Sequence, residues 1–388
     1  MTAPRSSAER VLRALVRICG PDFARPAGPA DAVAGRPARF VAAPPTAAGV
    51  AGLMRLAAEE GLAMLTRGGG TKIDWGVPPA RVDLLLDTGW LNGVWHHRPG
   101  ASTAEVGAGT PLRAVRAALA LRRQRLALDP ASPGATLGGV LAVNESGPLR
   151  HRFGAPDGLV HEYHHVTPDG VARRSSGAAV RDDGGPPAGV LLSAVVDLQP
   201  VPEARRWVVS PVSTPLQVHT AIGDTLDADV SPSAVEVDLP AAGPDGQRPG
   251  ALAVLVEGDS ADVAKRAGRL ATVLGATTAV EAQAPTWWGR YPFGAEDIAL
   301  RLTAPVAELH SVVYALHDAA AGAVPVRGSA GAGTVHAVLP GGTPPERVEQ
   351  ILDAVRAVLL GRGGRCVVIA APPPISDRLD MAAREDLF

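Results

Sequence analysis

Residues 67–72 read RGGGTK and form the most informative stretch of the chain. They follow LAMLT (62–66), a predicted strand that would set the position of the loop. Three successive glycines permit positive φ and let a ligand approach the backbone closely. Consecutive N–H groups can then point into one concavity that suits anionic oxygen, and Arg67 and Lys72 add positive charge nearby. The loop therefore predicts a diphosphate site, with a flexible glycine-rich hairpin tip as the alternative.

The spacing of this loop excludes two better-known phosphate loops. The Walker pattern GxxxxGK[ST] is absent from the stretch. The Rossmann pattern requires GxGxxG ahead of a helix, with an acidic residue about 20 positions further on, and the stretch does not match it. A different kind of nucleotide-binding loop is therefore expected.

A second stretch of small residues, DPASPGATLGGVLAVNESGPLRHRFG, spans residues 129–154. A turn that runs into a short helix exposes unpaired N–H groups at the helix start, where an anion can bind. Gly138 and Gly139 place no side chain in the way of a flat ring or a phosphate. The alternative is a tight crossing of a helix over a sheet, which also needs glycine.

The rest of the chain predicts helices and strands in two domains, as the length of 388 residues also indicates. A helix over 7–19 and a linker rich in Pro, Gly and Ala precede a βα pattern that starts near residue 38. After residue 200 we expect strands at 233–239, 251–257, 298–303, 323–327, 333–339 and 365–370, and helices near 215–227, 260–274, 306–321 and 344–361. This order favours an antiparallel sheet with helices on one face, and the β–α–β segments 251–281 and 298–339 indicate a ferredoxin-like duplication.

Composition excludes several classes of function. The formal net charge of -2 gives no basic excess for nucleic acid. The only cysteines, Cys19 and Cys366, are too few for an iron–sulfur cluster or a disulfide framework, which fits a reducing cytoplasm. The N-terminus does not resemble a signal peptide, and no apolar run reaches membrane-spanning length.

RGGGTK together with DPASPGATLGGVLAVNESGPLRHRFGAPDGLV (129–160) resembles the FAD-binding domain shared by vanillyl-alcohol oxidase and p-cresol methylhydroxylase. The second stretch is most similar to the FAD-binding subunit of glycolate oxidase. The resemblance covers residues 38–175 well and continues weakly through the C-terminal half. It implies an α+β protein with an N-terminal helix and linker (1–35), a two-subdomain FAD-binding domain of the p-cresol methylhydroxylase (PCMH) type (36–202) and a ferredoxin-like α+β cap domain (203–388).

The resemblance also implies which residues hold the cofactor. The backbone of the glycine loop would cradle the FAD diphosphate, and the second stretch would line the flavin and its ribityl chain. The residues carried over in this way are Arg67, Gly68, Gly69, Gly70, Thr71, Lys72, Pro130, Ser132, Gly134, Ala135, Thr136, Gly138, Gly139, Asn144, Gly147, Arg150 and Gly154. Some relatives attach the flavin to a histidine of the loop. The equivalent position is Thr71, which cannot form that bond, so non-covalent FAD is expected.

The chain departs from the family after the Asp169-Gly170 turn. Relatives continue with K-N-x-x-G-Y-D and G-x-x-G-x-L-G-V-I, whose backbones contact the flavin. Here the region reads SSGAAVRDDGGPPAGVLLSAVVDLQP (175–200), which is shorter and keeps only Ala188 to Leu192 of the final strand. The ending AAREDLF also lacks the D-P-x-x-x-x-N-P-G-R of relatives. The resemblance therefore supports the fold more firmly than the activity.

Two residues are candidates for catalysis or substrate binding. Arg290, in WWGRYPF (287–293), could clamp a carboxylate because guanidinium binds it through two hydrogen bonds, although a surface arginine is the commoner outcome. His336 could act as a base near the substrate carbon, with a solvent-facing strand histidine as the alternative. HEYHH (161–165) could ligate a metal, but alternation along a strand separates its side chains, so no metal site is expected.

The resemblance implies an FAD-dependent oxidoreductase that acts on the CH–OH group of a small 2-hydroxy acid. Electrons would then leave to a partner, with iron–sulfur and second flavoprotein subunits as candidates, because this chain has no cluster ligands. The protein would be cytoplasmic, or peripheral to the inner membrane through those partners. The alternatives are a degenerate, non-catalytic scaffold subunit and an FAD oxidase of another alcohol.

Overall fold

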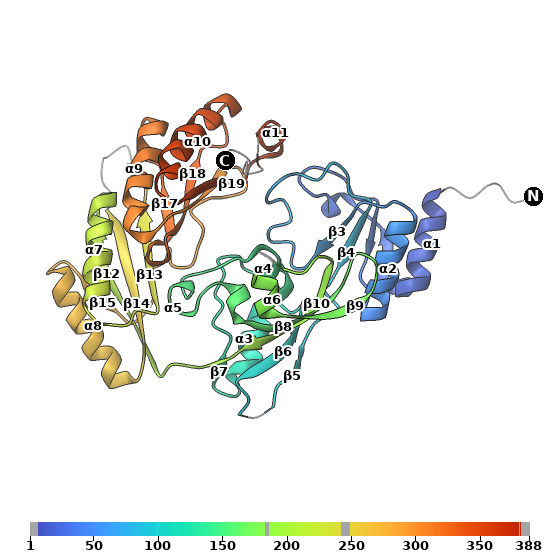
Figure 1. Ribbon diagram of the computed structural model, residues 1–388, viewed down its shortest axis with the longest axis horizontal. Helices are drawn as coiled ribbons and strands as arrows, with labels where there is room; N and C mark the ends of the chain where they lie inside the picture. Colours follow the sequence, from blue (N-terminus) through green and yellow to red (C-terminus); the bar gives the residue numbers. More distant parts are fainter. Residues whose placement is uncertain (1–6, 99, 183–185, 242–248, 380, 382–388) are drawn as a thin grey trace, which may run out of the picture.

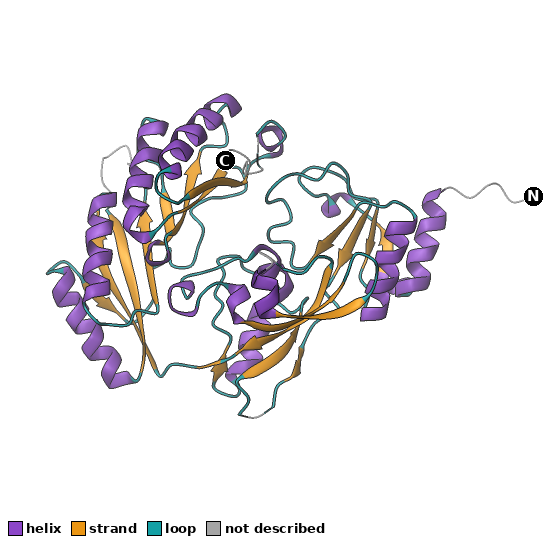
Figure 2. Cartoon of the chain, in the orientation of Figure 1, coloured by secondary structure: helices purple, strands orange, loops and turns teal. Residues whose placement is uncertain are grey.

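The computed structural model describes residues 7–98, 100–182, 186–241, 249–379 and 381. The chain forms two regions that lie side by side (Figure 1). We call residues 7–200 the N-terminal region and residues 204–379 the C-terminal region. Helices and strands alternate through both, as the cartoon shows (Figure 2). Among the described residues, no helix combines the length and the apolar character needed to cross a bilayer.

The N-terminal region begins with a small sheet covered by two helices. Its strands follow the order β1-β2-β4-β3, with β2, β4 and β3 parallel. Thr46 caps the second helix by accepting a hydrogen bond from the N–H of Gly49. The bounds are α1 (Ser7–Cys19), β1 (Ala24–Pro26), β2 (Phe40–Ala42), α2 (Ala47–Glu59), β3 (Met64–Arg67) and β4 (Leu84–Asp87). The apolar faces of α1 and α2 bury Leu15 and Leu53 completely against this sheet.

A second, antiparallel sheet completes the N-terminal region. Its order is β5-β6-β10-β8-β9, and Tyr163 lies fully buried in its core. The elements are β5 (Val94–His96), β6 (Thr103–Gly107), α3 (Leu112–Ala120), β7 (Gln124–Arg125), α4 (Leu137–Val143), α5 (Arg150–Phe153), β8 (Val160–Val166), β9 (Ala172–Ser176), α6 (Gly177–Asp182), β10 (Val190–Asp197) and β11 (Gln199–Pro200). The segment that looked shortened in the sequence is therefore the connection from β9 to β10, and part of it lies outside the described residues.

The C-terminal region is one eight-stranded antiparallel sheet in the order β15-β12-β14-β13-β17-β18-β16-β19. It contains β12 (Ala204–Val212), α7 (Pro215–Asp227), β13 (Ala234–Leu239), β14 (Gly250–Gly258), α8 (Ser260–Leu274), β15 (Ala279–Glu281), β16 (Ile298–Thr303), α9 (Leu309–Ala320), β17 (Val326–Ser329), β18 (Thr334–Leu339), α10 (Pro345–Leu360), β19 (Arg365–Ala370) and α11 (Pro373–Ser376). Each half has the order β–α–β–β–α–β with its strands arranged 4-1-3-2, which is the split-βαβ topology. The repeat is thus longer than the segments expected from sequence, because it includes β12 and β19.

The two faces of this sheet have different partners. The odd-numbered residues of β13 pack into the apolar core beneath α7 to α10, and Val235 is fully buried there. The even-numbered Glu236 and Asp238 point to the opposite face, since successive side chains of a strand alternate. Figure 1 shows that this face is turned toward the N-terminal region. Arg125 of β7 joins the two regions through two 2.8 Å hydrogen bonds to Glu257 of β14.

Candidate functional site

The glycine loop and the second small-residue stretch lie in direct contact. A Cβ added at Gly68 would come within 2.3 Å of the Thr136 hydroxyl oxygen, and one at Gly69 within 2.2 Å of the Gly134 carbonyl oxygen. Any larger side chain would therefore push the two segments apart. β3 supplies the loop, and α4, capped by Thr136, supplies the facing wall. The structure thus brings together the two stretches expected to form the cofactor site.

Backbone donors of the glycine loop are available to a ligand. Within the described part of the chain, the N–H groups of Gly69, Gly70 and Thr71 donate no hydrogen bond to another protein group. Gly70 has φ of +69°, a conformation that turns successive N–H groups toward one side. These unpaired donors beside a wall without bulky side chains fit a diphosphate, so the residues present suit FAD.

Arg67 anchors the loop from behind. Its guanidinium donates to Asp87 at 3.0 Å and to Asp31 at 2.9 Å. Arg25 also pairs with Asp31, and these contacts hold the pKa of the Asp31 carboxyl well below its usual range. Both carboxylates compete with any ligand for the Arg67 side chain. Its contribution is therefore to hold the loop at the end of β3.

Lys72 belongs to a buried polar network rather than to an open positive patch. Its ammonium forms an ion pair with Glu145 and lies 3.1 Å from the Ser132 hydroxyl. The Ser132 hydroxyl donates to the same carboxylate at 2.8 Å, and Tyr291 of the C-terminal region donates to it at 2.7 Å. The side chains of Lys72 and Glu145 are only 5% and 3% exposed. This network ties the glycine loop, the facing wall and the C-terminal region together.

Several other predicted site residues of this wall shape its backbone: they end a helix, form turns or allow two segments to cross closely. Asn144 ends α4 in the left-handed conformation and accepts a hydrogen bond from Asp157 N–H, so it shapes the turn. A Cβ on Gly147 would lie 1.8 Å from the Asp129 carbonyl oxygen, which makes glycine obligatory at this crossing. Gly154 has φ of +80°. Gly138 packs against Ala108 in a helix–sheet crossing, the alternative that the sequence left open.

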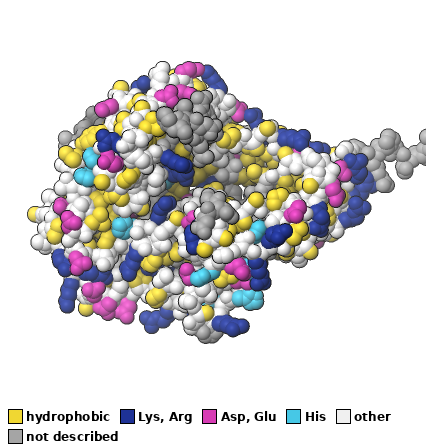
Figure 3. All heavy atoms as spheres, viewed as in Figure 1, with side chains coloured by type: hydrophobic (Ala, Val, Ile, Leu, Met, Phe, Trp, Pro, Cys, Tyr) yellow, Lys and Arg dark blue, Asp and Glu magenta, His cyan; other side chains and the backbone are white. Residues whose placement is uncertain are grey.

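A cavity lies at the seam between the two regions, and we call it the seam cavity. It encloses about 410 Å³, counting the part that is open to solvent. Positive side chains dominate its polar lining: Arg150 from α5, Arg290 from the loop before β16 and Arg327 from β17. The space-filling view shows Lys and Arg side chains around the hollow in the middle of the molecule (Figure 3). Both residues singled out from sequence, Arg290 and His336, border this cavity.

Burial moves the pKa values of two groups in the seam cavity in opposite directions. Burial, with a contribution from Arg301, lowers the pKa of His336 to about 4, so its imidazole is neutral at neutral pH. Burial raises the pKa of Glu236 to about 8, and the nearby Asp129 adds to the effect. The aromatic ring of Tyr291 lies edge-on to His336 at 4.9 Å. The cavity thus combines fixed positive charge with two groups that can exchange protons.

Asp129, at the start of the wall, makes stability depend on pH. Burial raises its pKa to about 7, although the Leu149 N–H stabilises the charged form. The unfolded carboxyl has a pKa of about 3.9, so the native state holds an extra proton between these values. The contribution of Asp129 to the free energy of unfolding is therefore fully present below about pH 4. It falls by on the order of 4 kcal/mol as the pH rises through 7.

Replacing Asp129 with asparagine removes this titration and keeps an acceptor for Leu149. We expect urea unfolding at several pH values to show a smaller loss between pH 4 and pH 7 in Asp129→Asn than in the wild type. The difference is the contribution of Asp129, while the loss due to Glu236, whose pKa is also raised, remains in both proteins. A variant whose stability falls as steeply as that of the wild type would show that Asp129 is ionised in the folded protein.

The HEYHH segment lies in β8, and each of its three histidines already has a protein partner. His161 contacts Asp197 at 2.7 Å, His164 contacts Glu162 at 2.6 Å, and His165 contacts Ser175 at 2.9 Å. Among the described residues, no group of three or more potential ligands is arranged to hold a metal ion. The histidines therefore link β8 to its neighbours in the sheet, β10 and β9.

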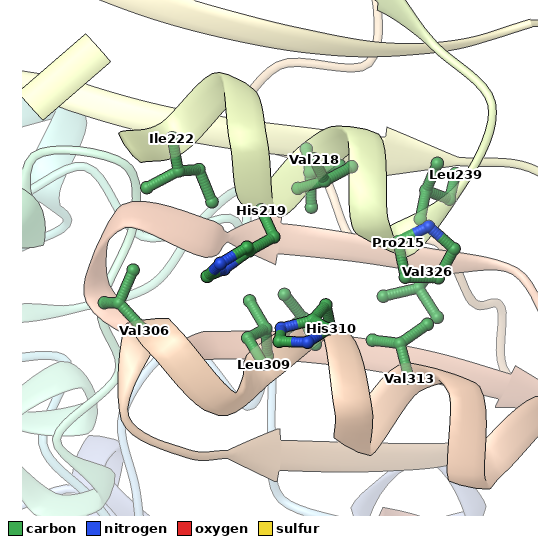
Figure 4. Close-up of a pocket in the computed structure, with 12 residues that line it drawn as sticks. Pro215, Val218, His219, Ile222, Leu239, Val306, Leu309, His310, Val313 and Val326 are labelled. Carbon is green, nitrogen blue, oxygen red and sulfur yellow. The ribbon is translucent and has the colours of Figure 1, made fainter. Parts of the chain in front are cut away.

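An apolar pocket on the far side of the C-terminal sheet does not belong to this site. It lies between α7 and α9, where the rings of His219 and His310 lie 4.3 Å apart at an angle of 39°, beside valine, leucine and isoleucine side chains (Figure 4). This is the helix-covered face of the sheet, opposite the face that meets the N-terminal region. The cavity with charged lining at the seam remains the candidate for chemistry.

Three residues that complete the site were not found from sequence. Glu145 lies inside the NESG stretch, but its pairing with Lys72 and Tyr291 depends on contacts distant in sequence. Glu236 stands in AVEVDL, where a charged residue in an otherwise buried strand was a usable signal. Tyr291 lies in the WWGRYPF stretch, but its packing against Trp75 of the N-terminal region depends on the tertiary structure.

Comparisons with known proteins agree with this geometry. Residues 38–176 match the model of an FAD binding domain. Two uncharacterized FAD-linked oxidoreductases from strains of Mycobacterium tuberculosis are each 24% identical over 369 residues, covering 84% of this chain and 80% of theirs.

Solved structures show the same fold. An alkyldihydroxyacetonephosphate synthase matches with a TM-score of 0.72 and 16% identity, over 94% of this chain and 83% of that one. A p-cresol methylhydroxylase matches with a TM-score of 0.70 and 13% identity, over 97% and 92% of the two chains. The free donors of the glycine loop, the wall beside it and the matched domain agree on one cofactor, FAD. Residues 38–176 therefore form an FAD-binding domain, and the chain as a whole is similar to the two FAD-linked oxidoreductases and shares its fold with the two solved enzymes.

Proposed function

We propose that the protein oxidises the CH–OH group of a small 2-hydroxy acid with non-covalently bound FAD. The observation that carries the proposal is the seam cavity, in which Arg150, Arg290 and Arg327 converge beside His336 and Glu236. Guanidinium groups bind a carboxylate through charge-assisted hydrogen bonds. Among the described residues, Arg327 is already paired with Asp238, whereas Arg150 donates only to the Ser146 hydroxyl and Arg290 is exposed at the cavity. A substrate carboxylate would supply these two guanidinium groups with a counter-charge, which an uncharged alcohol would not. The chemistry of the lining therefore favours an anionic substrate.

The residues of the chain orient the substrate, while FAD supplies the redox chemistry by accepting a hydride equivalent. The wall residues Ala131, Gly147 and Pro148 border the same cavity as the arginines, so cofactor wall and substrate site are contiguous. Tyr291, which lines the cavity, packs against the rings of Trp75 and Phe293, so aromatic side chains hold it in place. Transfer of the electrons to a partner subunit completes the proposal, since both cysteines are buried singly in separate regions.

The test begins with the absorbance spectrum of the purified protein. We expect flavin bands near one FAD per chain, and acid precipitation should release all of the flavin into the supernatant. Anaerobic glycolate or lactate should then bleach the bands, whereas primary alcohols of the same size should not. Bleaching by uncharged alcohols alone would contradict the assignment of an acidic substrate.

A second candidate function is a non-catalytic subunit that stabilises a catalytic relative. The observation that favours it is the short β9–β10 connection, where α6 replaces the longer flavin-contacting segment of relatives. Flavin that no 2-hydroxy acid or other alcohol reduces would support this candidate over the enzyme.

Arg290 provides a direct prediction for substrate binding. Its side chain is exposed at the mouth of the seam cavity, so Arg290→Met should leave folding and FAD content unchanged. Loss of one charge-assisted hydrogen bond of about 1.5–3 kcal/mol should raise KM for the 2-hydroxy acid by about 10-fold to 100-fold. Arg113→Met, at an exposed position of α3, is the matched control and should leave KM unchanged. An unchanged KM in Arg290→Met would place the carboxylate elsewhere.

A further inference from the structure

One carboxyl oxygen of a residue that lines the seam cavity has no hydrogen-bond partner in the part of the chain that the structure describes. Glu236 of β13 is 4% exposed, and its Oε1 has no partner among the described residues. Buried polar atoms are nearly always paired, so a buried carboxyl oxygen without a partner requires an explanation. Glu236 borders the cavity that is also lined by both candidate substrate-binding groups, Arg290 and His336. Glu236 therefore lies in the wall of the space that a substrate would fill and has a carboxyl oxygen free to accept a hydrogen bond.

Charged and titratable groups surround Glu236 from each element packed around it. On its own strand, Asp238 is occupied by a 2.8 Å hydrogen bond from Arg327 of β17. His336 comes from β18, Arg150 from α5, and Arg290 and Tyr291 from the loop before β16. Asp129 of the N-terminal region acts on Glu236 through charge repulsion. The Ser329 hydroxyl of β17 favours the charged form of Glu236. None of the guanidinium groups of the described residues is hydrogen-bonded to Glu236, and its Oε1 remains without a partner.

We propose that Glu236 accepts the proton of the substrate hydroxyl group; this rests on the 2-hydroxy acid oxidation proposed above. FAD, held by the glycine loop and the wall of α4, would supply the oxidant as a hydride acceptor. The C–H bond at the substrate carbon would break, and its electron pair would leave with the hydrogen as that hydride. The O–H bond of the hydroxyl group on the same carbon breaks, and its proton goes to the carboxylate of Glu236. The remaining electron pair forms the carbonyl bond of a 2-oxo acid. One hydride and one proton leave the substrate, so atoms and charges balance.

The pKa values in the cavity favour Glu236 over His336 as the base. A general base works best when its pKa lies near the working pH. Burial raises the pKa of Glu236 to about 8 and lowers that of His336 to about 4. Below pH 8 only a minor fraction of Glu236 is ionised, so the reaction should accelerate as pH rises. A reaction that used His336 would not depend on pH above about 5.

The first experiment measures the rate of anaerobic flavin reduction by glycolate or lactate as a function of pH. In the wild-type holoenzyme, the rate should rise about 10-fold per pH unit and level off near pH 8. Glu236→Gln should reduce the flavin about 10²- to 10⁴-fold more slowly, with no such rise. Glu236→Asp keeps a carboxyl and should recover part of the rate with its pH dependence. The control is Glu281→Gln at an exposed position of β15, which should behave like the wild type.

A second experiment measures the protonation of the Glu236 carboxyl group by infrared spectroscopy, in the absence of substrate. The infrared C=O band of a protonated carboxylic acid should disappear from the apoprotein as pH rises through about 8. Subtracting the spectrum of Glu236→Gln isolates this group from Asp129, which titrates nearby. Because Glu236 is protonated at neutral pH, glutamine is a near-isosteric replacement and the variant should fold.

The outcomes separate this inference from the proposed function. If Glu236→Gln keeps the wild-type rate and pH profile, Glu236 is not the base, whereas the proposed function stands. A wild-type rate that does not vary with pH, or a carboxyl band that does not titrate, also overturns the inference. If no 2-hydroxy acid reduces the wild-type flavin, the proposed function fails and the inference fails with it.

Discussion

Gly69→Ala is expected to produce protein that no longer retains FAD. The added Cβ would lie 2.2 Å from the Gly134 carbonyl oxygen, a backbone atom that cannot rotate away. The glycine loop and the wall of α4 must then separate, and the free N–H groups of the loop lose the position in which they face the diphosphate. Overpacking of this kind destabilises a protein by about 1–3 kcal/mol, and the displaced nest should weaken FAD binding by at least about 100-fold.

The measurement is the flavin-to-protein absorbance ratio after purification, followed by titration of the apoprotein with FAD. Gly223→Ala is the control, because a Cβ at this position of α7 meets nothing within 4 Å. That variant should bind FAD normally and be slightly more stable, since alanine favours a helix over glycine. Normal FAD content in Gly69→Ala would mean that the diphosphate does not rest on this loop.

The local part of the fold could be predicted from sequence because its signals are local. α1, α7 and α8 begin and end where their apolar periodicity and caps place them. β12 was missed because Arg205, Arg206 and Pro211 interrupt its apolar pattern. The structure shows why these residues are tolerated: Arg205 pairs with Glu257, and Pro211 lies near the end of the strand. Tertiary pairing here overrides a pattern that does not predict a strand.

The candidate site likewise has a part that the sequence predicts and a part that depends on tertiary contacts. The glycine loop and the wall were predicted because their function requires particular residue types in consecutive positions. The seam cavity was not predicted, because it is built from α5, β13, β17 and β18, whose side chains meet only after the two regions have packed together. Arg67 and Lys72 illustrate the limit most clearly. The sequence shows that both side chains are positively charged. It does not show which carboxylates pair with them, because the tertiary structure brings these carboxylates into contact: Asp31, Asp87 and Glu145.

Glu145→Ala should be among the most destabilising single substitutions in the chain. It removes the carboxylate that pairs with Lys72 and accepts hydrogen bonds from Ser132 and Tyr291. The Lys72 ammonium is then buried with no counter-charge, and Tyr291 loses its link to the N-terminal region. Breaking a buried ion pair from one side costs about 3–5 kcal/mol. Thermal and urea unfolding should show this loss, whereas Glu346→Ala, which breaks an exposed pair with Arg378, should cost less than about 1 kcal/mol.

The double variant Lys72→Met, Glu145→Leu distinguishes two causes of the stability lost in Glu145→Ala. One is the cost of burying the Lys72 ammonium without a counter-charge, and the other is the loss of the ion pair itself. Replacing both partners with apolar side chains removes the buried ammonium, so most of the stability lost in Glu145→Ala should return. FAD binding should not return fully, because the Lys72 charge beside the glycine loop is gone. If the double variant is as unstable as Glu145→Ala, the hydrogen bonds of Ser132 and Tyr291 rather than the ion pair hold the seam together. Joining the two regions through Tyr291 would then be the main role of Glu145, and the glycine loop would be held mainly by the carboxylates behind Arg67.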